Sequence, residues 1–218
     1  RWRRDTIEQR YERKGESGRV RQTPRRVEVE IKAPDQEPIR FDSRAGKAIP
    51  EGLESIAARV DQTVIVELTA RGAVTKVRGA ASAAQRASYV AAFLEWPRKA
   101  IAVGDRWSKF PLQRTPYPPF GTLVYSTRYT LKNVGKAGRV TVQAETTVLF
   151  EPADDVKIDS PVVNISKQSA GGSMVFDANG LLLESRFRSE LQITITSGNV
   201  VRTERATSET AQRLRSVK

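Results

Sequence analysis

The stretch RVEVEIK, residues 26–32, alternates apolar and charged side chains without interruption. A period of two residues is typical of a β-strand with one face in a core and the other in water. Pro34 and Pro38 follow and end the pattern. The segment therefore predicts a strand whose buried residues are Val27, Val29 and Ile31.

Further strands are predicted on both sides of this one. Residues 5–14 alternate weakly, and residues 63–77 predict two strands joined by a turn at Gly72. Three prolines in TPYPPFG, residues 115–121, predict a rigid extended loop. The second half of the chain predicts strands at 122–131, 139–150, 162–169, 172–177, 180–196 and 199–206.

Two segments have the period of a helix instead. In residues 50–60, apolar side chains recur at i, i+3, i+4 and i+7 from Leu53, and residues 80–96 have a similar stripe that ends before Pro97. We expect both to be amphipathic helices on one face of the sheet, and 208–218 to form a short helix or tail. The residues expected to line the space beneath the helices are Leu53, Ile56, Val90, Phe93 and Leu94.

The segment EWPRKAIAVGDRW, residues 95–107, predicts a joint. Pro97 ends the second helix, Gly104 and Asp105 predict a tight turn, and Trp107 is expected to pack back as a largely buried anchor. On either side, VELTARGAVTKV (66–77) and MVFDANGLLLES (174–185) both place Ala-x-Gly between two β-like runs, which favours a duplicated unit.

The predicted fold is mainly β, of the α+β type: one curved antiparallel sheet or half-barrel, with two or three amphipathic helices on one face. Its parts are a basic N-terminal arm or edge strands (1–26), a first β-rich half with two helices (27–96), a joint with a proline-rich loop (97–121), a second β-rich half (122–207) and the C-terminal helix or tail (208–218).

The formal net charge of +12 is concentrated in part of the chain. Residues 71–114 carry nine basic and two acidic side chains. Such a field attracts anionic partners, including lipid headgroups, although a solvated basic surface is the alternative. The predicted surface for an anionic partner consists of Arg98, Lys99, Arg106 and Lys109.

Missing residue types exclude several kinds of chemistry. The chain has no histidine and no cysteine, which rules out a Ser-His-Asp triad, disulfides and zinc-thiolate sites. The acidic segment EPADDVKIDS, residues 151–160, lacks the spacing and the glycine of a calcium loop and predicts a solvated loop. The glycine pair in AGGS, residues 170–173, predicts a bulge or turn. No catalytic residue, metal site or cofactor is predicted.

Two classes of partner are disfavoured by the sequence. No run approaches 18 apolar residues, so no transmembrane helix is predicted. Aromatic and basic residues mix at 107–120, but no known RNA-binding signature is present, which disfavours nucleic acid. The chain begins at Arg1 rather than Met, and we expect an N-terminus that was processed or trimmed.

The joint and one hairpin are similar to elements of a family of exported bacterial proteins of unknown function. The shared elements are a P-x-x-x-V-x-V-G-D-x-W joint, here Pro97 to Trp107 with Ile101 in place of the first valine, and an F-D-x-x-G hairpin, here Phe176 to Gly180. That family resembles the curved half-barrels of periplasmic lipoprotein carriers. The resemblance implies a curved sheet, an exported, periplasmic or envelope-associated location and an apolar ligand, and it carries over no catalytic residue.

Two functions remain open on this basis. The first is a non-enzymatic binding or scaffold module, with an apolar or lipid-like ligand beneath the helices unless the same residues close a dry core. The alternative is a structural subunit of a larger assembly that docks through its basic surface. An enzyme is the weakest hypothesis, because no base or carboxylate pair is recognisable.

Overall fold

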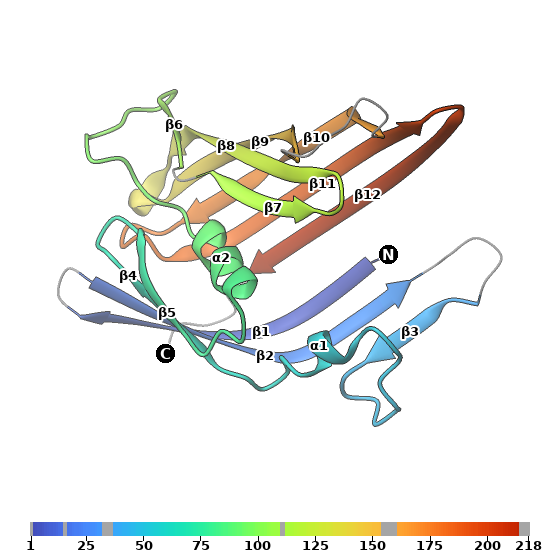
Figure 1. Cartoon of the computed structure of the whole chain (residues 1–218). Coiled ribbons are helices and arrows are strands. Elements are labelled where there is room, and N and C mark those ends of the chain that lie inside the picture. Colours follow the sequence, from blue (N-terminus) through green and yellow to red (C-terminus); the bar gives the residue numbers. More distant parts are fainter. Residues whose placement is uncertain (1, 15–16, 32–36, 110–111, 154–160, 214–218) are drawn as a thin grey trace. The chain divides into compact units, whose positions relative to one another are not determined.

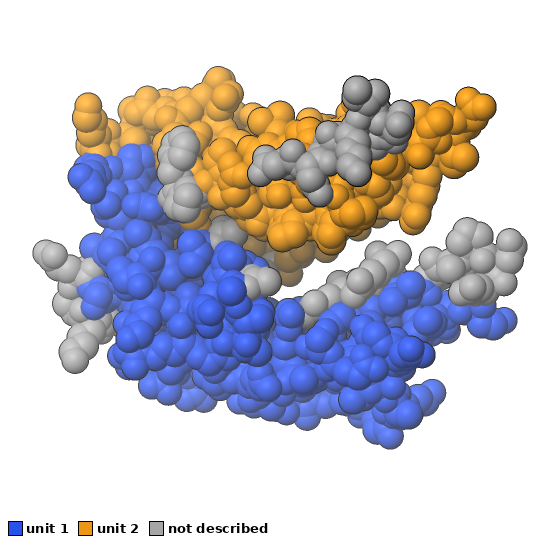
Figure 2. Space-filling model, viewed as in Figure 1, with its two compact units in different colours: residues 1–98 blue, residues 99–218 orange. Residues whose placement is uncertain are grey.

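A computed structural model describes residues 2–14, 17–31, 37–109, 112–153 and 161–213 (Figure 1). The chain forms two compact units, unit 1 at Arg1–Arg98 and unit 2 at Lys99–Lys218 (Figure 2). Unit 1 has a five-stranded and unit 2 a seven-stranded antiparallel sheet. The expectation of a mainly β, antiparallel protein is therefore confirmed, but the strands form two sheets rather than the single curved sheet that the sequence predicted.

Unit 1 is organised around one long strand. Its elements are β1 (Trp2–Lys14), β2 (Ser17–Ile31), β3 (Ile39–Asp42), α1 (Glu54–Ala57), β4 (Val64–Leu68), β5 (Val74–Arg78) and α2 (Ala83–Ala92). The sheet order is β1-β2-β4-β5, and β3 also pairs with β2. Because β3 and β4 use different parts of β2, this strand connects the whole sheet.

The apolar face of unit 1 runs along β2 through a bulge. Val20 pairs with Tyr11, and Val27 pairs with Asp5, so both partners belong to one alternating set on β1. The register shifts at Thr6/Ile7, where an extra residue enters β2 and reverses its alternation. Val20 and Val27 therefore face the same side of the sheet, although one has an even and the other an odd residue number. Both side chains are buried.

The expectation of two or three amphipathic helices is wrong. In the segment 50–60 only the single turn α1 is helical, because Asp61 adopts a φ of 61° and its N–H donates to Pro24 O at the bulge (2.7 Å). α2 begins at the cap Ser82, whose Oγ accepts from Gln85 N (3.1 Å), but it ends at Ala92.

The chain leaves α2 early because it contacts the turn between β4 and β5. Phe93 is extended, and Trp96 N donates to Arg71 O (2.8 Å). In return Arg71 Nη1 donates to Trp96 O (3.2 Å). A Cβ at Gly72 would lie 2.3 Å from Leu94 O, so this close approach requires glycine.

Unit 2 is a meander in which neighbouring strands in sequence mostly pair. Its order is β12-β11-β10-β9-β8-β6, and β7 also pairs with β8. The elements are β6 (Arg106–Ser108), β7 (Gln113–Tyr117), β8 (Gly121–Val134), the 3-10 turn η1 (Lys136–Gly138), β9 (Val140–Pro152), β10 (Val162–Phe176), β11 (Leu182–Ser197) and β12 (Val200–Arg213).

Three local expectations for unit 2 are wrong. The described part of the tail is not helical, because β12 continues to Arg213 and pairs along its whole length with β11. Part of the proline-rich loop is strand β7, where Pro116 is tolerated because the strand pairs only with β8. Gly171 and Gly172 lie inside β10 rather than in a turn. A Cβ at Gly172 would lie 2.0 Å from Arg186 O, so the close approach of β11 requires glycine at this position.

The two segments expected to be duplicated form hairpins with the same loop. In unit 1, Gly72 N and Ala73 N donate to Thr69 O and Oγ1. In unit 2, Gly180 N donates to Asp177 O, and Leu181 N donates to Asp177 Oδ1. Both glycines have positive φ, 82° and 79°. The match is at the level of one five-residue loop.

We predict that Leu53→Asp unfolds unit 1. Leu53 is 2% exposed, and a buried carboxylate without a partner costs several kcal/mol, about the stability of a small domain. Ile49→Asp is the control, because Ile49 is 50% exposed. Circular dichroism during urea unfolding should show a large loss only for Leu53→Asp. Equal effects of the two substitutions would contradict the assignment of Leu53 to the core.

Candidate binding surfaces

The residues expected to line a ligand space lie on one sheet face but in two separate clusters. Leu53 and Ile56 are buried against Val27, Val29 and Phe41. Phe93 packs on the cluster of Val20, Val64, Val66 and Leu68, Leu94 is buried, and Val90 is half-buried. These side chains fill the core that α1 and the end of α2 cover.

The joint is a tight turn held by backbone and side chain. Gly104 has a φ of 97°, and its N–H donates to Leu131 O (2.8 Å). Asp105 Oδ2 accepts from Ala102 N (2.8 Å), as expected of a turn-forming residue. Pro97 is half-buried two residues before the boundary between the units, which lies between Arg98 and Lys99.

Trp107 is half-buried rather than largely buried. Its ring lies beside Tyr129 with centroids 5.7 Å apart at 32°. The indole contacts a buried aromatic residue from the short strand β6, which pairs with only three residues of β8. Because β6 is a short edge strand, Trp107 stays partly accessible to solvent, which the sequence pattern did not indicate.

The basic residues expected to meet an anionic partner are solvent-accessible. Arg98, Lys99 and Arg106 are exposed, and Lys109 is half-buried. Arg98 closes unit 1, whereas the other three belong to unit 2. Of the acidic segment 151–160 that we expected to form a solvated loop, Glu151 and Pro152 instead end strand β9, where Glu151 pairs with Arg114, and residues 154–160 lie outside the described residues.

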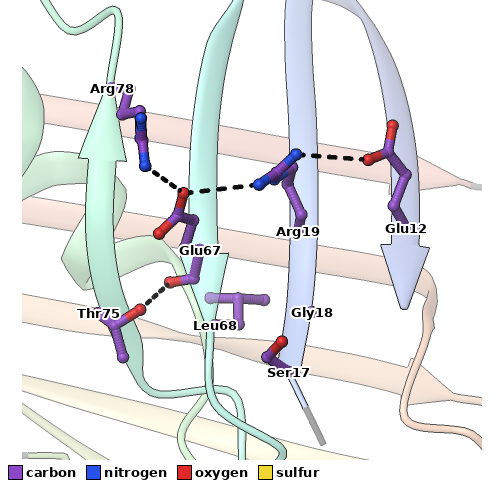
Figure 3. A pocket seen from close by; sticks show the side chains of 8 residues that line it. All are labelled: Glu12, Ser17, Gly18, Arg19, Glu67, Leu68, Thr75 and Arg78. Atoms are coloured by element: carbon purple, nitrogen blue, oxygen red, sulfur yellow. Dashed lines mark hydrogen bonds and ion pairs between the residues drawn. The ribbon is translucent and has the colours of Figure 1, made fainter. Parts of the chain in front are cut away.

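The other face of the unit 1 sheet is covered by arginine and glutamate side chains. This face has a depression of about 350 Å³, and the side chains that line it are drawn in Figure 3. Across it, the Glu67 carboxylate forms ion pairs with the guanidinium groups of Arg78 (3.0 Å) and Arg19 (3.9 Å). Arg19 also forms an ion pair with Glu12 (3.9 Å). Arg21 also pairs with Glu12 (3.1 Å), so three guanidinium groups share two carboxylates, and pairing within the row neutralises most of its charge.

Carboxylates further along this face are held in the ionised form. Arg26 donates to both oxygens of Asp42 (3.0 and 2.5 Å), and with the backbone N–H of Arg44 it lowers the pKa of Asp42 to about 2. Hydrogen bonds from Arg25 and Arg10 lower the pKa of Glu8. A carboxylate with a lowered pKa is a poor general acid near neutral pH, so these pairs favour a structural role.

The sheet of unit 2 is strongly curved. Its inner face is defined by the register: Tyr117, Leu123, Phe150 and Ile193 lie on it, as does Glu204 of β12. Tyr117 on β7 and Glu204 on β12 belong to opposite edges of the sheet, yet Tyr117 Oη donates to Glu204 Oε2 (2.8 Å). Such a contact requires the sheet to bend toward this face (Figure 1).

The inner face is apolar where the sheet divides. β9 pairs with β10 only at 140–145. Beyond this point the backbone N–H of Val148 donates to the side-chain Oε1 of Gln168 on β10 (2.6 Å) rather than to a backbone carbonyl of that strand. Two branches of the sheet thus face each other across one apolar cluster. Its buried members are Leu123, Val148, Val163, Ile193 and Ile195, and its half-buried rim is Tyr117, Phe120, Tyr125, Phe150, Ile165 and Leu191.

This arrangement was not visible in the sequence. Tyr117 and Glu204 are 87 residues apart, and Tyr117 lies in a segment that predicted a loop. The alternation in β8, β9 and β11 could have indicated one apolar face, but not that the two edges meet. Within the described residues, no cluster of three or more acidic side chains could hold a metal ion.

Comparison with protein-family models, with curated proteins and with solved structures finds no match for this chain. Among the described residues, no helix has the length and apolar character needed to cross a membrane.

We predict that Tyr117→Phe destabilises unit 2 at neutral pH but not at strongly alkaline pH. Losing a hydrogen bond to a carboxylate should cost about 1–2 kcal/mol. Burial, with the bond to Glu204, raises the pKa of Tyr117 from 10.0 to about 12. Between pH 10 and about 12 the Tyr117 hydroxyl therefore stays protonated in the folded protein but is ionised in the unfolded chain. Over this range the stability that the hydrogen bond contributes to the folded state declines.

The measurement is the urea midpoint of wild type and Tyr117→Phe at pH 8 and near pH 12, followed by circular dichroism. The difference in urea midpoint between wild type and Tyr117→Phe should disappear at the higher pH. Burial also raises the pKa of Tyr125 and Tyr129, and that contribution is common to both proteins. A difference that stays constant with pH would show that the Tyr117 hydroxyl does not form this bond.

Proposed function

We propose that this protein is a non-enzymatic binding or scaffold module that holds an apolar ligand, such as an acyl chain, against the inner face of unit 2. The observation that carries the proposal is the hydrogen bond between Tyr117 and Glu204, which joins two opposite edges of one curved sheet. It encloses an apolar surface formed by two branches of the sheet. Ligand sites are concave, mostly apolar and equipped with few polar groups, and this surface has that character.

Within this proposal the ligand contacts the half-buried rim rather than the filled centre. Phe150 and Leu191 contribute apolar surface from the two branches, and Tyr117 contributes both a ring and a hydroxyl. Aromatic side chains with a polar end suit the entrance of such a site. Leu53, Ile56 and Phe93 pack in the core clusters of unit 1 and Leu94 is buried, so these residues are better explained as a dry core.

Export to the cell envelope belongs to the same proposal. It rests on the resemblance of the joint and the F-D-x-x-G hairpin to a family of exported proteins. An antiparallel sheet curved toward an apolar face, as in a half-barrel, is compatible with that resemblance. Fractionation of the native host with an antibody against the protein tests the location directly.

The ligand is tested with a fluorescent fatty acid as probe. Wild type should bind it saturably, and Leu191→Trp should weaken binding at least several-fold by filling the rim, because added side-chain volume competes with a ligand. Leu149→Trp is the matched control, since Leu149 lies on the outer face of β9 and is 57% exposed. Binding unchanged in both variants, or absent in wild type, would contradict the proposal.

The second candidate function is docking onto an anionic partner through the basic surface. A specific observation favours it: within the described part of the chain, Arg98, Lys99 and Arg106 form no ion pair, whereas many arginines of the unit 1 sheet do. Unneutralised exposed cations attract anions over about a Debye length.

We predict that vesicles of mixed neutral and anionic lipid sediment with the protein at low salt. Binding should disappear as salt rises from about 0.1 M to about 1 M, because the Debye length falls from about 10 Å to about 3 Å. Replacing Arg98, Lys99 and Arg106 by Glu should abolish it.

The control makes the same charge change elsewhere, at the exposed residues Lys47, Lys76 and Arg188. If both triple variants lose binding equally, only net charge matters. If wild type does not sediment at low salt, the basic surface is merely solvated.

A further inference from the structure

Strand β12 is a long and regular edge. It pairs with β11 from Val200 to Arg213 without a register shift, and within the described residues no strand pairs with its other side. Every described side chain from Val200 to Ala211 is exposed except that of Glu204, which is half-buried. The strand contains neither proline nor glycine. Edges of this kind are templates for a further strand unless a bulge, a proline or charges prevent pairing.

The hairpin turn decides which backbone groups of β12 point outward. Ser197 and Val200 close a two-residue loop in which Gly198 has a φ of 55°, as in a type II′ turn. The residues that close such a loop form a hydrogen-bonded pair. Even-numbered residues of β12 therefore bond to β11, and odd-numbered residues direct N–H and C=O groups to the free edge.

The charges on the edge select a partner strand. In an antiparallel pair of two copies of β12, a two-fold axis at Thr207 places Arg205 opposite Glu209 of the other copy, and Glu209 opposite the other Arg205. Opposite charges in facing positions favour pairing, and like charges disfavour it. This register also places odd-numbered residues of one β12 opposite odd-numbered residues of the other. The N–H and C=O groups at the two free edges can therefore bond to each other.

Neighbouring registers are worse. An axis at Arg205 would oppose two arginines, and an axis at Glu204 or Glu209 would oppose two glutamates. Axes at Ala206 or Ser208 form no charge pair. An axis at Thr203 pairs Arg202 with Glu204 but uses only half of the strand.

We propose that the protein forms a two-fold symmetric dimer in which β12 pairs antiparallel with β12 of a second copy, with Thr207 on the axis. The two unit 2 sheets then continue into each other. Tyr117 contacts Glu204 from the inner face, and the outward backbone groups of β12 are those of its odd-numbered residues. The inference is independent of any ligand.

A cysteine cross-link tests the register, because the chain has no native cysteine. In a hydrogen-bonded antiparallel pair the two Thr207 Cα atoms lie about 5.5 Å apart, within the range of a disulfide. Thr207→Cys should form a covalent dimer under mild oxidation. Val201→Cys is the matched control on the same side of the strand, and it should form no covalent dimer because residue 213 of the other copy faces it. Equal cross-linking of both variants would overturn the proposed register.

A charge reversal tests the interface without a covalent bond. Arg205→Glu places glutamates opposite each other twice and should shift the dimer to monomer in analytical ultracentrifugation. Because Arg205 also pairs with Glu190 of its own chain (2.8 Å), Glu190→Gln is the control that removes this intrachain pair but keeps Arg205, and it should leave the dimer intact. The double variant Arg205→Glu with Glu209→Arg restores opposite charges and should restore the dimer. A monomeric wild type, or a double variant no better than the single one, would overturn the proposal.

Discussion

Each of the two sheets must bury one apolar face, and they meet this requirement differently. In unit 1, the segments around α1 and α2 cover Val27, Val29, Val64 and Val66. In unit 2, the cluster at the divided end of the sheet is instead enclosed by the sheet itself, which bends until its edges meet at Tyr117 and Glu204. Burial of apolar surface provides the driving force, and the hydrogen bond at the edges selects this curvature among others.

The polar faces follow from the same constraint. Strand alternation that buries valines on one side of unit 1 places arginine and glutamate on the other, where they pair across neighbouring strands. Exposed ion pairs contribute little stability individually, and here they give the glutamates of this side arginine partners on neighbouring strands. Arg98, Lys99 and Arg106 differ because, within the described residues, they form no ion pair.

The proposed functions use separate parts of the molecule. An apolar ligand would contact the inner face of unit 2, an anionic surface would meet the exposed basic residues, and a second copy would pair with the free edge of β12. The ligand proposal and the dimer are compatible, since pairing at an edge leaves the inner face unchanged. Both depend on the curved sheet of unit 2 rather than on a catalytic group.

The sequence by itself determined most of the long strands of unit 2, the β4–β5 hairpin, the turns at Gly72 and Gly180 and the apolar side of β2 at Val27 and Val29, because alternation and turn residues act over a few positions. It failed where distant contacts override local preference. α1 is one turn because Asp61 bonds to the bulge of β2, and residues 208–213 are a strand because an i,i+4 pair of about 0.2–0.5 kcal/mol cannot compete with pairing to β11. Only the tertiary structure decided that β7 and β12 meet, since nothing local relates Tyr117 to a glutamate 87 residues away. Curvature is the sum of twists and bulges over many strands, and no single segment encodes it.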